Sequence, residues 1–368
     1  MKKILIATTD YPNNEGGRKL FYVHVRSIYY KKQNIDLEVL NFNAKYSYEF
    51  EGVKVITLKE FKRKYKEEEY KLLICHAPNL KKHFLFIKKY SSVFNDNIVF
   101  FFHGHEIIRI SNHYPVPFDF NTKGKLIFEL GKIYDLFKIR IWKRLFRKFK
   151  ENFTFIFVSS FLKKICIEDF RVEENFFVNS YIIPNSVGIY FQENNYQNYD
   201  QQYDFITIRN NYDSSTYSID LVNEIAKNNS GFRFCVIGKG NFFNHKMKSN
   251  NLEIVNRDLT HQEILGFLDS SKYALMPTRH DSQGVMSCEC ATYGIPVITS
   301  DIEVCREIFE GFDNVDLVPN EKITEIDFST YKFPNITNKK NKKYFDENTV
   351  KHEVALLTAL LREVENQL

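Results

Sequence analysis

The feature that most constrains the fold is a repeated alternation of short apolar runs and longer segments with helical spacing. In the first half, five runs have the length and composition of buried strands: residues 3–7, 37–42, 72–75, 97–102 and 153–158. After a polar segment the pattern restarts, with strand-like runs at 204–208, 233–237, 252–255, 273–276 and 297–299. Helical periodicity lies between the runs. Such alternation predicts an α/β chain whose parallel sheets are covered by helices on both faces.

The chain is long enough for two such domains. Its 368 residues exceed one ordinary domain, and its 43% hydrophobic content supplies two cores. We predict a first Rossmann-like, doubly wound domain at 1–187, a second at 188–345, and a final helix within 346–368 that packs back toward the first. Two such domains in series are expected to face each other across a cleft at the carboxyl ends of their strands.

Composition argues against several other classes of protein. The six cysteines form no Cys-x-x-Cys pair and lie mostly in apolar runs, as buried, reduced thiols of a cytosolic protein do. Neither Cys288 and Cys290 nor the run His103-Gly-His105-Glu106 has a further ligand pair at metal spacing, so we expect no metal site. No run approaches the roughly 20 apolar residues of a membrane-spanning helix. The opening residues MKKILIATTDYP predict a strand, not a signal peptide.

Residues 123–150 combine positive charge with apolar spacing. They hold ten Lys and Arg residues against two acidic ones. Five apolar residues recur there at helical spacing: Leu136, Ile139, Trp142, Phe146 and Phe149. This pattern is typical of a basic amphipathic helix on an anionic membrane surface, and also of a core helix with a solvated basic face. No nucleic-acid-binding motif is found, so we expect no nucleic-acid partner.

The segment 279–301, RHDSQGVMSCECATYGIPVITSD, carries the strongest chemical signal. A loop with Asp281 and Gly284 leads into a helix whose free N–H groups can bind phosphate oxygens. Glu289 follows one to two turns later, so two carboxylates can accept hydrogen bonds from the hydroxyls of one sugar ligand. Taken alone, the spacing also fits a helix N-cap at Asp281 and an exposed glutamate at 289.

Residues 277–298 resemble the C-terminal signature of the GT-B-fold retaining glycosyltransferases of family 4, or glycosyltransferase group 1. The matching residues are Pro277, Thr278, Asp281, Gly284, Glu289, Gly294, Pro296, Val297 and Ile298. The variant is similar to that of bacterial capsule, O-antigen and cell-wall polysaccharide enzymes. The same resemblance extends over nearly the whole chain, through Gly16-Gly17, His103, 183–187 and Gly238-Lys239-Gly240.

The resemblance implies a role for each matched residue. For catalysis it implies His103 near the reacting centre, Asp281 on the donor-sugar hydroxyls and Glu289 on the donor ribose. It places Arg209 at the donor diphosphate, where a guanidinium fork matches phosphate oxygens. Further donor contacts are implied from three loops: Gly16, Gly17, Gly238, Lys239, Gln283, Gly284 and Val285.

Two positions depart from the family pattern. Asp281 stands where the family usually has Glu, which is one methylene longer. Tyr217 falls where the family pairs the arginine with a Lys, so one diphosphate cation is missing. Lys239 or Arg279 is a candidate to replace it.

The resemblance implies a GT-B enzyme whose first domain binds the acceptor and whose second binds the nucleotide sugar. We expect a retaining, metal-independent hexosyltransferase that needs no cofactor and uses a UDP- or GDP-sugar as donor. Its acceptor would be a lipid-linked glycan in bacterial surface polysaccharide synthesis, such as capsule, O-antigen or lipopolysaccharide. We expect it in the cytoplasm, peripheral on the inner face of the cytoplasmic membrane, with 123–150 at the anionic surface. A non-catalytic sugar-nucleotide-binding or assembly partner is the alternative; a dehydrogenase would need the Gly-x-Gly-x-x-Gly that the first loop lacks.

Overall fold

The structure is a computed structural model that describes residues 3–16, 19–66, 70–199, 201–336 and 339–366, with side chains to residue 362. By its contacts the chain divides into two compact units. Unit 1 comprises Met1–Arg109, Asp135–Ser186 and Asp346–Leu368, and unit 2 comprises Ile110–Tyr134 and Val187–Phe345. The sequence prediction assigns residues 110–134 to the first domain, whereas their contacts group them with unit 2.

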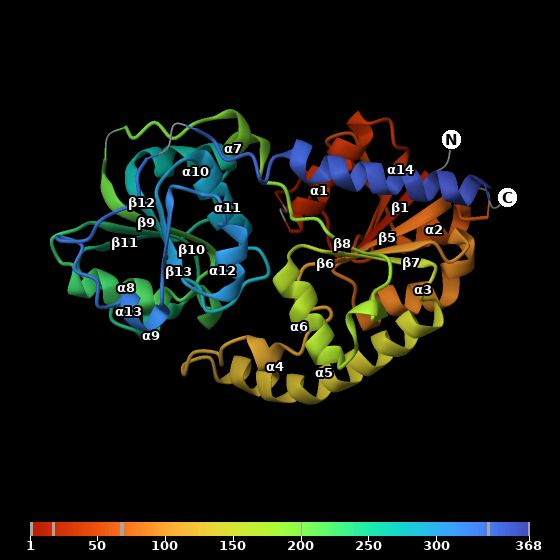
Figure 1. Cartoon of the computed structure of the whole chain (residues 1–368), viewed down its shortest axis with the longest axis horizontal. Coiled ribbons are helices and arrows are strands. Elements are labelled where there is room, and N and C mark those ends of the chain that lie inside the picture. The colour runs from red at the N-terminus through yellow and green to blue at the C-terminus, as the bar shows by residue number, and fades with distance from the viewer. Residues whose placement is uncertain (1–2, 17–18, 67–69, 200, 337–338, 367–368) are drawn as a thin grey trace. The chain divides into compact units, whose positions relative to one another are not determined.

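Unit 1 is built on an eight-stranded sheet in the order β3-β4-β2-β1-β5-β6-β7-β8 (Figure 1). Neighbouring strands pair in parallel, except that β3 and β4 form an antiparallel hairpin. The strands are β1 (Lys3–Thr8), β2 (Leu37–Asn41), β3 (Tyr48–Phe50), β4 (Val53–Ile56), β5 (Tyr70–His76), β6 (Ile98–Phe102), β7 (Phe153–Phe157) and β8 (Ser180–Ile182). Strands β6 and β7, with the sequences IVFFF and FTFIF, are buried throughout because helices cover both faces of the sheet.

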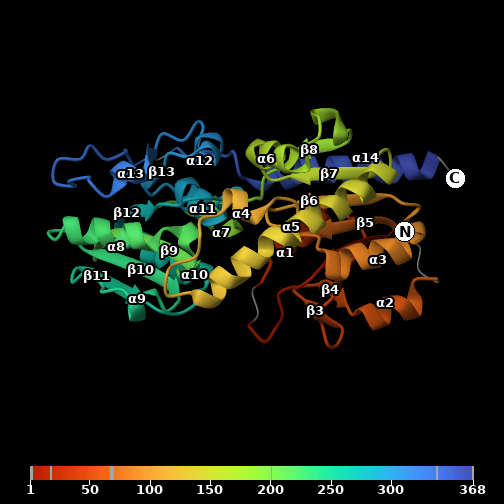
Figure 2. The ribbon, with the colours of Figure 1, turned by 90° about the horizontal axis from the view of Figure 1, so that it is seen from below.

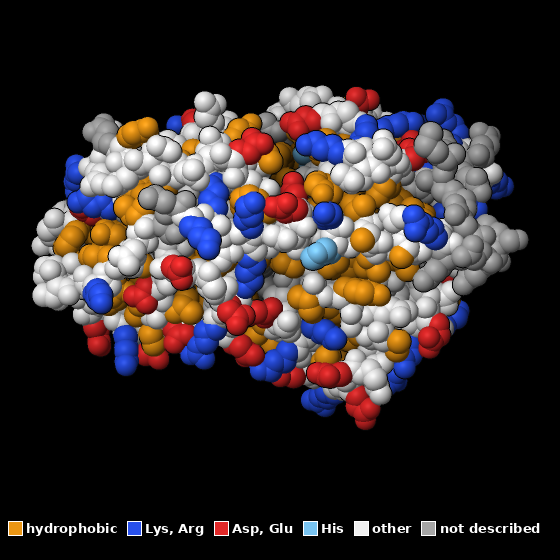
Figure 3. Space-filling model, turned by 45° about the horizontal axis from the view of Figure 1, so that its top comes forward, with side chains coloured by type: hydrophobic (Ala, Val, Ile, Leu, Met, Phe, Trp, Pro, Cys, Tyr) orange, Lys and Arg blue, Asp and Glu red, His pale blue; other side chains and the backbone are white. Residues whose placement is uncertain are grey.

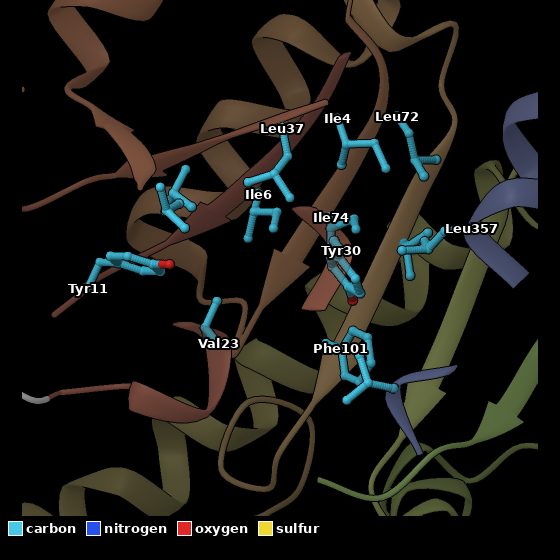
Figure 4. Packing of buried hydrophobic residues seen from close by; sticks show 14 of the residues in the cluster. Ile4, Ile6, Tyr11, Val23, Tyr30, Leu37, Leu72, Ile74, Phe101 and Leu357 are labelled. Carbon is cyan, nitrogen blue, oxygen red and sulfur yellow. The ribbon is translucent and has the colours of Figure 1, made fainter. Parts of the chain in front are cut away.

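The core of unit 1 joins the sheet to helices from both ends of the chain. Figure 4 shows Ile4 and Ile6 of β1 in one cluster with Ile74 of β5 and Leu357 of the C-terminal helix. The helices are α1 (Phe21–Lys32), α2 (Leu58–Lys64), α3 (Leu85–Tyr90), the second part of α5 (Thr122–Lys148), α6 (Ser160–Phe170) and α14 (Val350–Asn366). One-turn helices are η1 (Leu80–Phe84), η2 (Ser91–Phe94), η3 (Glu174–Phe176) and η5 (Asp346–Asn348).

A buried ion pair ties α14 to α1. Arg26 Nε donates to Glu353 Oε2 at 3.0 Å, and the two side chains are 1% and 0% exposed. The same guanidinium donates to Asn185 Oδ1 at 2.9 Å, just beyond β8. The C-terminal helix therefore packs within unit 1, on the N-terminal helix and β5.

Unit 2 is built on a six-stranded, wholly parallel sheet in the order β11-β10-β9-β12-β13-β14. The strands are β9 (Tyr203–Asn211), β10 (Phe234–Lys239), β11 (Leu252–Val255), β12 (Ser271–Met276), β13 (Val297–Ser300) and β14 (Val315–Val318). In order of appearance they run 3-2-1-4-5-6, the Rossmann order, which reverses direction between β9 and β12. Ligands of such sheets bind at this switch point, outside the carboxyl ends of the strands.

The helices of unit 2 are α4 (Ile110–His113), the first part of α5, α7 (Ile189–Glu193), η4 (Ser215–Tyr217), α8 (Ile219–Asn228), α9 (Phe242–His245), α10 (His261–Asp269), α11 (Val285–Tyr293), α12 (Glu303–Ile308) and α13 (Asn320–Ile323). Thr260 and Glu263 form the capping box that their spacing predicts at the start of α10.

The prediction of two Rossmann-like, doubly wound parallel-sheet domains is confirmed. Each predicted strand is present, within a few residues of its predicted bounds. The predicted apolar face of α5 is wrong at one residue. Ile139, Trp142 and Phe146 are buried, but Leu136 is 54% exposed and does not belong to the buried face.

Candidate functional site

The switch point of unit 2 brings Arg209 beside the loop that follows β12. Arg209 lies near the carboxyl end of β9, and its Nη2 donates to the carbonyl oxygen of Pro277 at 2.9 Å. The guanidinium carbon stands 5.2 Å from the centre of the Tyr217 ring. These contacts hold the fork at the position where a Rossmann sheet binds its ligand.

Arg209 is buried yet incompletely hydrogen-bonded. Its side chain is 6% exposed, and among the described residues its Nε has no hydrogen-bond partner. Burial lowers the pKa of the guanidinium, while the nearby carboxylate of Asp281 opposes that shift. A buried cation with an unused donor is costly unless an anion completes its contacts. The arrangement therefore favours an anionic ligand at Arg209.

The loop from Asp281 to Gly284 forms a tight turn ahead of helix α11. Asp281 Oδ1 accepts hydrogen bonds from the backbone N–H groups of Ser282, Gln283 and Gly284 at 2.7, 3.2 and 2.8 Å. Gly284 has φ of 69°, and a Cβ there would lie 3.1 Å from Asp281 Oδ2. Asp281 thus holds the loop ahead of the helix through one oxygen. It is not the N-cap of α11, because that position is Gly284 and has no side-chain cap hydrogen bond, so the N-cap alternative for Asp281 is wrong. This geometry leaves the first turn of α11, beginning at Val285, to offer N–H groups to phosphate oxygens.

Glu289 lies inside α11 and is 6% exposed, so the alternative that it is an exposed glutamate is wrong. Its Oε1 accepts a hydrogen bond from the backbone N–H of Gly188 at 3.1 Å. Burial raises the pKa of Glu289 to about 7, with the Gly188 hydrogen bond opposing the shift. When ionised, this carboxylate has acceptor capacity left for hydroxyl groups.

Gly238 is required by the close approach of β10 to β9. Its φ is 141°, and a Cβ would lie 1.7 Å from the carbonyl oxygen of Arg209. The next residue, Lys239, accepts a backbone hydrogen bond from Tyr212 N at 3.0 Å. Gly238 therefore contributes to the site indirectly. Because it has no Cβ, the backbone of Arg209 can pack closely against β10.

The loop before α8 brings Tyr217 under Arg209. Thr278 Oγ1 and the backbone N–H of Arg279 both donate to the carbonyl oxygen of Thr216, at 3.0 and 2.8 Å. Burial raises the pKa of Tyr217, and the Asp281 carboxylate adds to the shift. The side chain is therefore neutral near pH 7 and gives the site a hydroxyl and an aromatic face in place of a cation.

Both candidate replacements for the missing cation are bound to carboxylates. Arg279 makes a two-fold contact with Asp220, at 2.8 and 2.7 Å. Lys239 forms an ion pair with Asp258, and its side chain is 55% exposed. Either residue would have to leave its partner to reach a diphosphate.

The remaining predicted site residues lie in unit 1. His103 follows β6 and is half-buried; its Nε2 is 3.3 Å from His76 Nδ1, and its ring lies 4.3 Å from that of Tyr22. Burial and the charge of Arg26 hold the pKa of His103 well below its usual value, so the ring is neutral at pH 7. Gly16, in the loop after β1, has φ of 92°, which favours glycine. Gly17 lies outside the described residues.

Two of the contacts at these sites were not predicted from the sequence. The first is the contact of His103 with His76. His76 is the last residue of β5 and His103 follows β6, so the position of a polar residue at a strand end was the signal that could have identified it. Gly188, which binds Glu289, lies in a segment whose composition is that of a linker, and no local pattern predicts the contact.

Among the described residues, no group of three or more His, Cys, Asp and Glu side chains is placed to hold a metal ion. The six cysteines are buried and free.

Comparison with known proteins agrees with this geometry. Residues 206–327 match the family model described as glycosyl transferases group 1. No curated protein matches the chain.

Solved structures with the same fold cover most of the chain. Sucrose-phosphate synthase from Thermosynechococcus elongatus is 10% identical, with 88% of this chain and 87% of that chain covered and a TM-score of 0.65. A glycosyltransferase from Rickettsia africae is 14% identical, with 98% and 96% covered and a TM-score of 0.60. Anabaena HepE is 12% identical, with 100% and 99% covered and a TM-score of 0.58. Over residues 206–327 the chain is therefore similar to glycosyl transferases group 1, and its two domains have the GT-B fold of these solved structures.

Proposed function

We propose that the protein is a retaining glycosyltransferase that moves a sugar from a UDP- or GDP-sugar to a glycan acceptor. The observation that carries this proposal is the buried, incompletely bonded Arg209 at the switch point of unit 2, beside the family-type segment 277–298. Three similar proteins support the donor class: HepE was solved with UDP and glucose, TarM with UDP, and an E. coli trehalose-6-phosphate protein with UDP-2-fluoro glucose.

Each site residue receives a role in this proposal. Arg209 stabilises the negative charge that grows on the diphosphate as the sugar leaves. Glu289 accepts hydrogen bonds from the ribose hydroxyls, and the backbone of Gln283, Gly284 and Val285 contacts diphosphate and sugar. Asp281 uses Oδ1 to hold the loop, so Oδ2 is the oxygen available to a donor-sugar hydroxyl.

The reaction needs no carboxylate nucleophile. The acceptor hydroxyl attacks on the face from which the diphosphate departs, and the leaving phosphate takes its proton. Catalysis then consists of positioning and charge stabilisation, without a metal ion. His103, with the Gly16-Gly17 loop, is assigned to the sugar and phosphate side of the donor, and its neutral ring can donate one hydrogen bond.

We further propose a lipid-linked acceptor in bacterial surface polysaccharide synthesis and a peripheral position on the inner face of the cytoplasmic membrane. The basic, apolar-rich helix α5 supports this location. Across the described parts of the chain, no helix is long and apolar enough to span a bilayer.

Nucleotide binding provides the first test. UDP, GDP, CDP and NAD, with their common sugar conjugates, are screened by thermal shift with and without EDTA. A ligand at 100 times its Kd adds about 2.7 kcal/mol of stability, which such an assay resolves. We expect one nucleoside diphosphate series to raise the melting temperature, with or without EDTA. Arg209→Gln should remove the response, and the exposed control Arg257→Gln should keep it. A response to NAD alone would reject the proposal.

A second candidate, a non-catalytic sugar-nucleotide-binding partner, is favoured by one observation. Tyr217 replaces the expected cation, while Lys239 and Arg279 are both held by carboxylates. This candidate predicts nucleotide binding without donor hydrolysis or transfer at any acceptor. Turnover of a sugar nucleotide that Glu289→Ala and Arg209→Ala abolish would exclude it.

A further inference from the structure

Helix α5 leaves an unusual number of large apolar side chains exposed to solvent. Figure 2 shows α5, in yellow, as one unbroken helix. Seven side chains in its first two thirds are 45–61% exposed: Leu126, Ile127, Leu130, Ile133, Tyr134, Leu136 and Phe137. Single exposed apolar residues are ordinary, but a contiguous group on one element marks an interaction surface.

These apolar side chains continue into positive charge along one face of the helix. Residues 126, 130, 133, 137, 140, 144 and 147 follow each other at intervals of three or four, so they form one stripe. The α5 stripe is Leu126, Leu130, Ile133, Phe137, Arg140, Arg144 and Arg147. Each of these residues is exposed. The stripe thus has an apolar half followed by a cationic half.

The opposite face of α5 anchors the helix to the protein. Asp135, Ile139, Trp142 and Phe146 are buried there, and Lys138 Nζ lies 2.7 Å from Asp135 Oδ1. The fold therefore does not use the α5 stripe for its own packing.

The charge of α5 indicates which kind of partner binds the stripe. The helix holds nine Lys and Arg residues against Glu129 and Asp135, whereas on the face that Figure 3 shows, basic and acidic side chains are interspersed. A second copy paired in parallel through this stripe would place arginines against arginines, and an antiparallel copy would place arginines against leucines, in a seam that prefers apolar residues. A bilayer with anionic headgroups instead accepts both halves: acyl chains bury Leu and Ile, and phosphates neutralise Arg.

We propose, building on the peripheral location proposed above, that the α5 stripe is the surface that binds an anionic lipid bilayer. The apolar half, Leu126 to Phe137, enters the boundary between headgroups and acyl chains. The cationic half, Arg140 to Arg147, lies against the phosphates. The buried face with Trp142 keeps the helix attached to the protein during binding.

Vesicle sedimentation tests this surface with the full chain. Vesicles of phosphatidylcholine mixed with phosphatidylglycerol are compared with pure phosphatidylcholine vesicles. We expect binding to the anionic vesicles only. The triple variant Leu126→Gln, Leu130→Gln, Ile133→Gln should lose that binding. The triple variant Arg140→Gln, Arg144→Gln, Arg147→Gln should weaken it on the order of 100-fold, because each basic residue contributes about fivefold.

A matched control separates this surface from general hydrophobicity. Leu85 on α3 is 58% exposed, close to the exposure of the α5 leucines, and Leu85→Gln should bind vesicles as the wild type does. All variants alter exposed side chains, so their melting temperatures should match the wild type, and their nucleotide response should be retained. If the wild type showed no nucleotide response, the proposed glycosyltransferase function would be rejected, whereas the vesicle-binding result would still hold.

Three results would overturn the lipid surface. One is equal binding to neutral and anionic vesicles. The second is unchanged vesicle binding by both α5 triple variants. The third is concentration-dependent dimerisation, seen by analytical ultracentrifugation, that the same variants break while no vesicle binding occurs; the occupant would then be a second copy of the chain.

Discussion

Replacing Glu289 by Gln keeps the size of the side chain and removes its charge, inside a helix where the carboxyl is 6% exposed. Burial raises the pKa of this carboxyl to about 7, so its ionisation changes over the range in which the protein would work. If the ionised form is the acceptor for the ribose hydroxyls, nucleotide affinity must follow the ionised fraction.

The expected change can be calculated from that pKa. With a pKa of about 7, the ionised fraction rises from roughly 10% at about pH 6 to roughly 90% at about pH 8. The affinity for the preferred nucleoside diphosphate should therefore rise about tenfold over this interval. Isothermal titration calorimetry at the two pH values measures it directly. Glu289→Gln should bind weakly at both pH values and lose this slope.

Stability should respond in the opposite direction. Between pH 4.5 and about 7, the unfolded chain has released the Glu289 proton while the folded chain retains it, so folding stability falls as pH rises. The pKa difference corresponds to about 3 kcal/mol when the whole interval is crossed. The wild type should thus lose stability relative to Glu289→Gln as pH increases from 4.5 to 7, as denaturant unfolding can measure.

Glu353 is the control for the nucleotide-binding measurement. Burial also raises its pKa to about 7, but it pairs with Arg26 in unit 1. Glu353→Gln should therefore keep the pH dependence of nucleotide binding. A nucleotide affinity that is flat with pH in the wild type, or a slope that Glu353→Gln removes and Glu289→Gln leaves, would refute the ribose role of Glu289.

Three further substitutions test the site and its support. Tyr217→Lys adds a cation beside Arg209, so the melting temperature of the free protein should fall. The affinity for a nucleoside diphosphate, measured by calorimetry, should rise about tenfold or more, as expected for one charged hydrogen bond. Unchanged affinity would show that position 217 does not face the diphosphate. Gly238→Ala should cost more than about 1 kcal/mol in chemical denaturation, because φ is 141° and the added Cβ meets the Arg209 carbonyl oxygen; wild-type stability would contradict that account. Trp142 is fully buried on the inner face of α5, so Trp142→Ala should lower the free energy of unfolding by about 3–5 kcal/mol, measured by the same method. A loss below about 1 kcal/mol would show that α5 is not anchored there.

The parallel sheets were predictable because buried parallel strands are locally distinctive. The run IVFFF of β6 is apolar at each position, as a strand covered on both faces must be, and the Gly-Ile-Pro turn before β13 marks where α11 ends. Short edge strands carry no such signal. β8 (SYI) is exposed at two of its three positions, and β14 (VDLV) is half-buried, so both depend on a neighbouring strand for their conformation.

The site was predictable at the level of segments and less so at the level of contacts. The motif identified Asp281, Gly284 and Glu289, since their spacing is local. That Arg209 lies against Tyr217, and that Glu289 binds Gly188, depends on how distant segments pack. The same limit applies to α5. Helical spacing predicts its two faces, but which face is buried is decided by the sheet that Trp142 and Phe146 contact.

The most direct measurement of the central claim is sugar transfer from the nucleotide that binds, followed by NMR of the product. Purified wild-type protein is incubated with that sugar nucleotide and a set of lipid-linked glycan acceptors, in EDTA. We expect release of the nucleoside diphosphate, a product whose anomeric configuration is that of the donor, and loss of both in Arg209→Gln. An inverted product, or tight nucleotide binding with no turnover on any acceptor, would contradict a retaining glycosyltransferase.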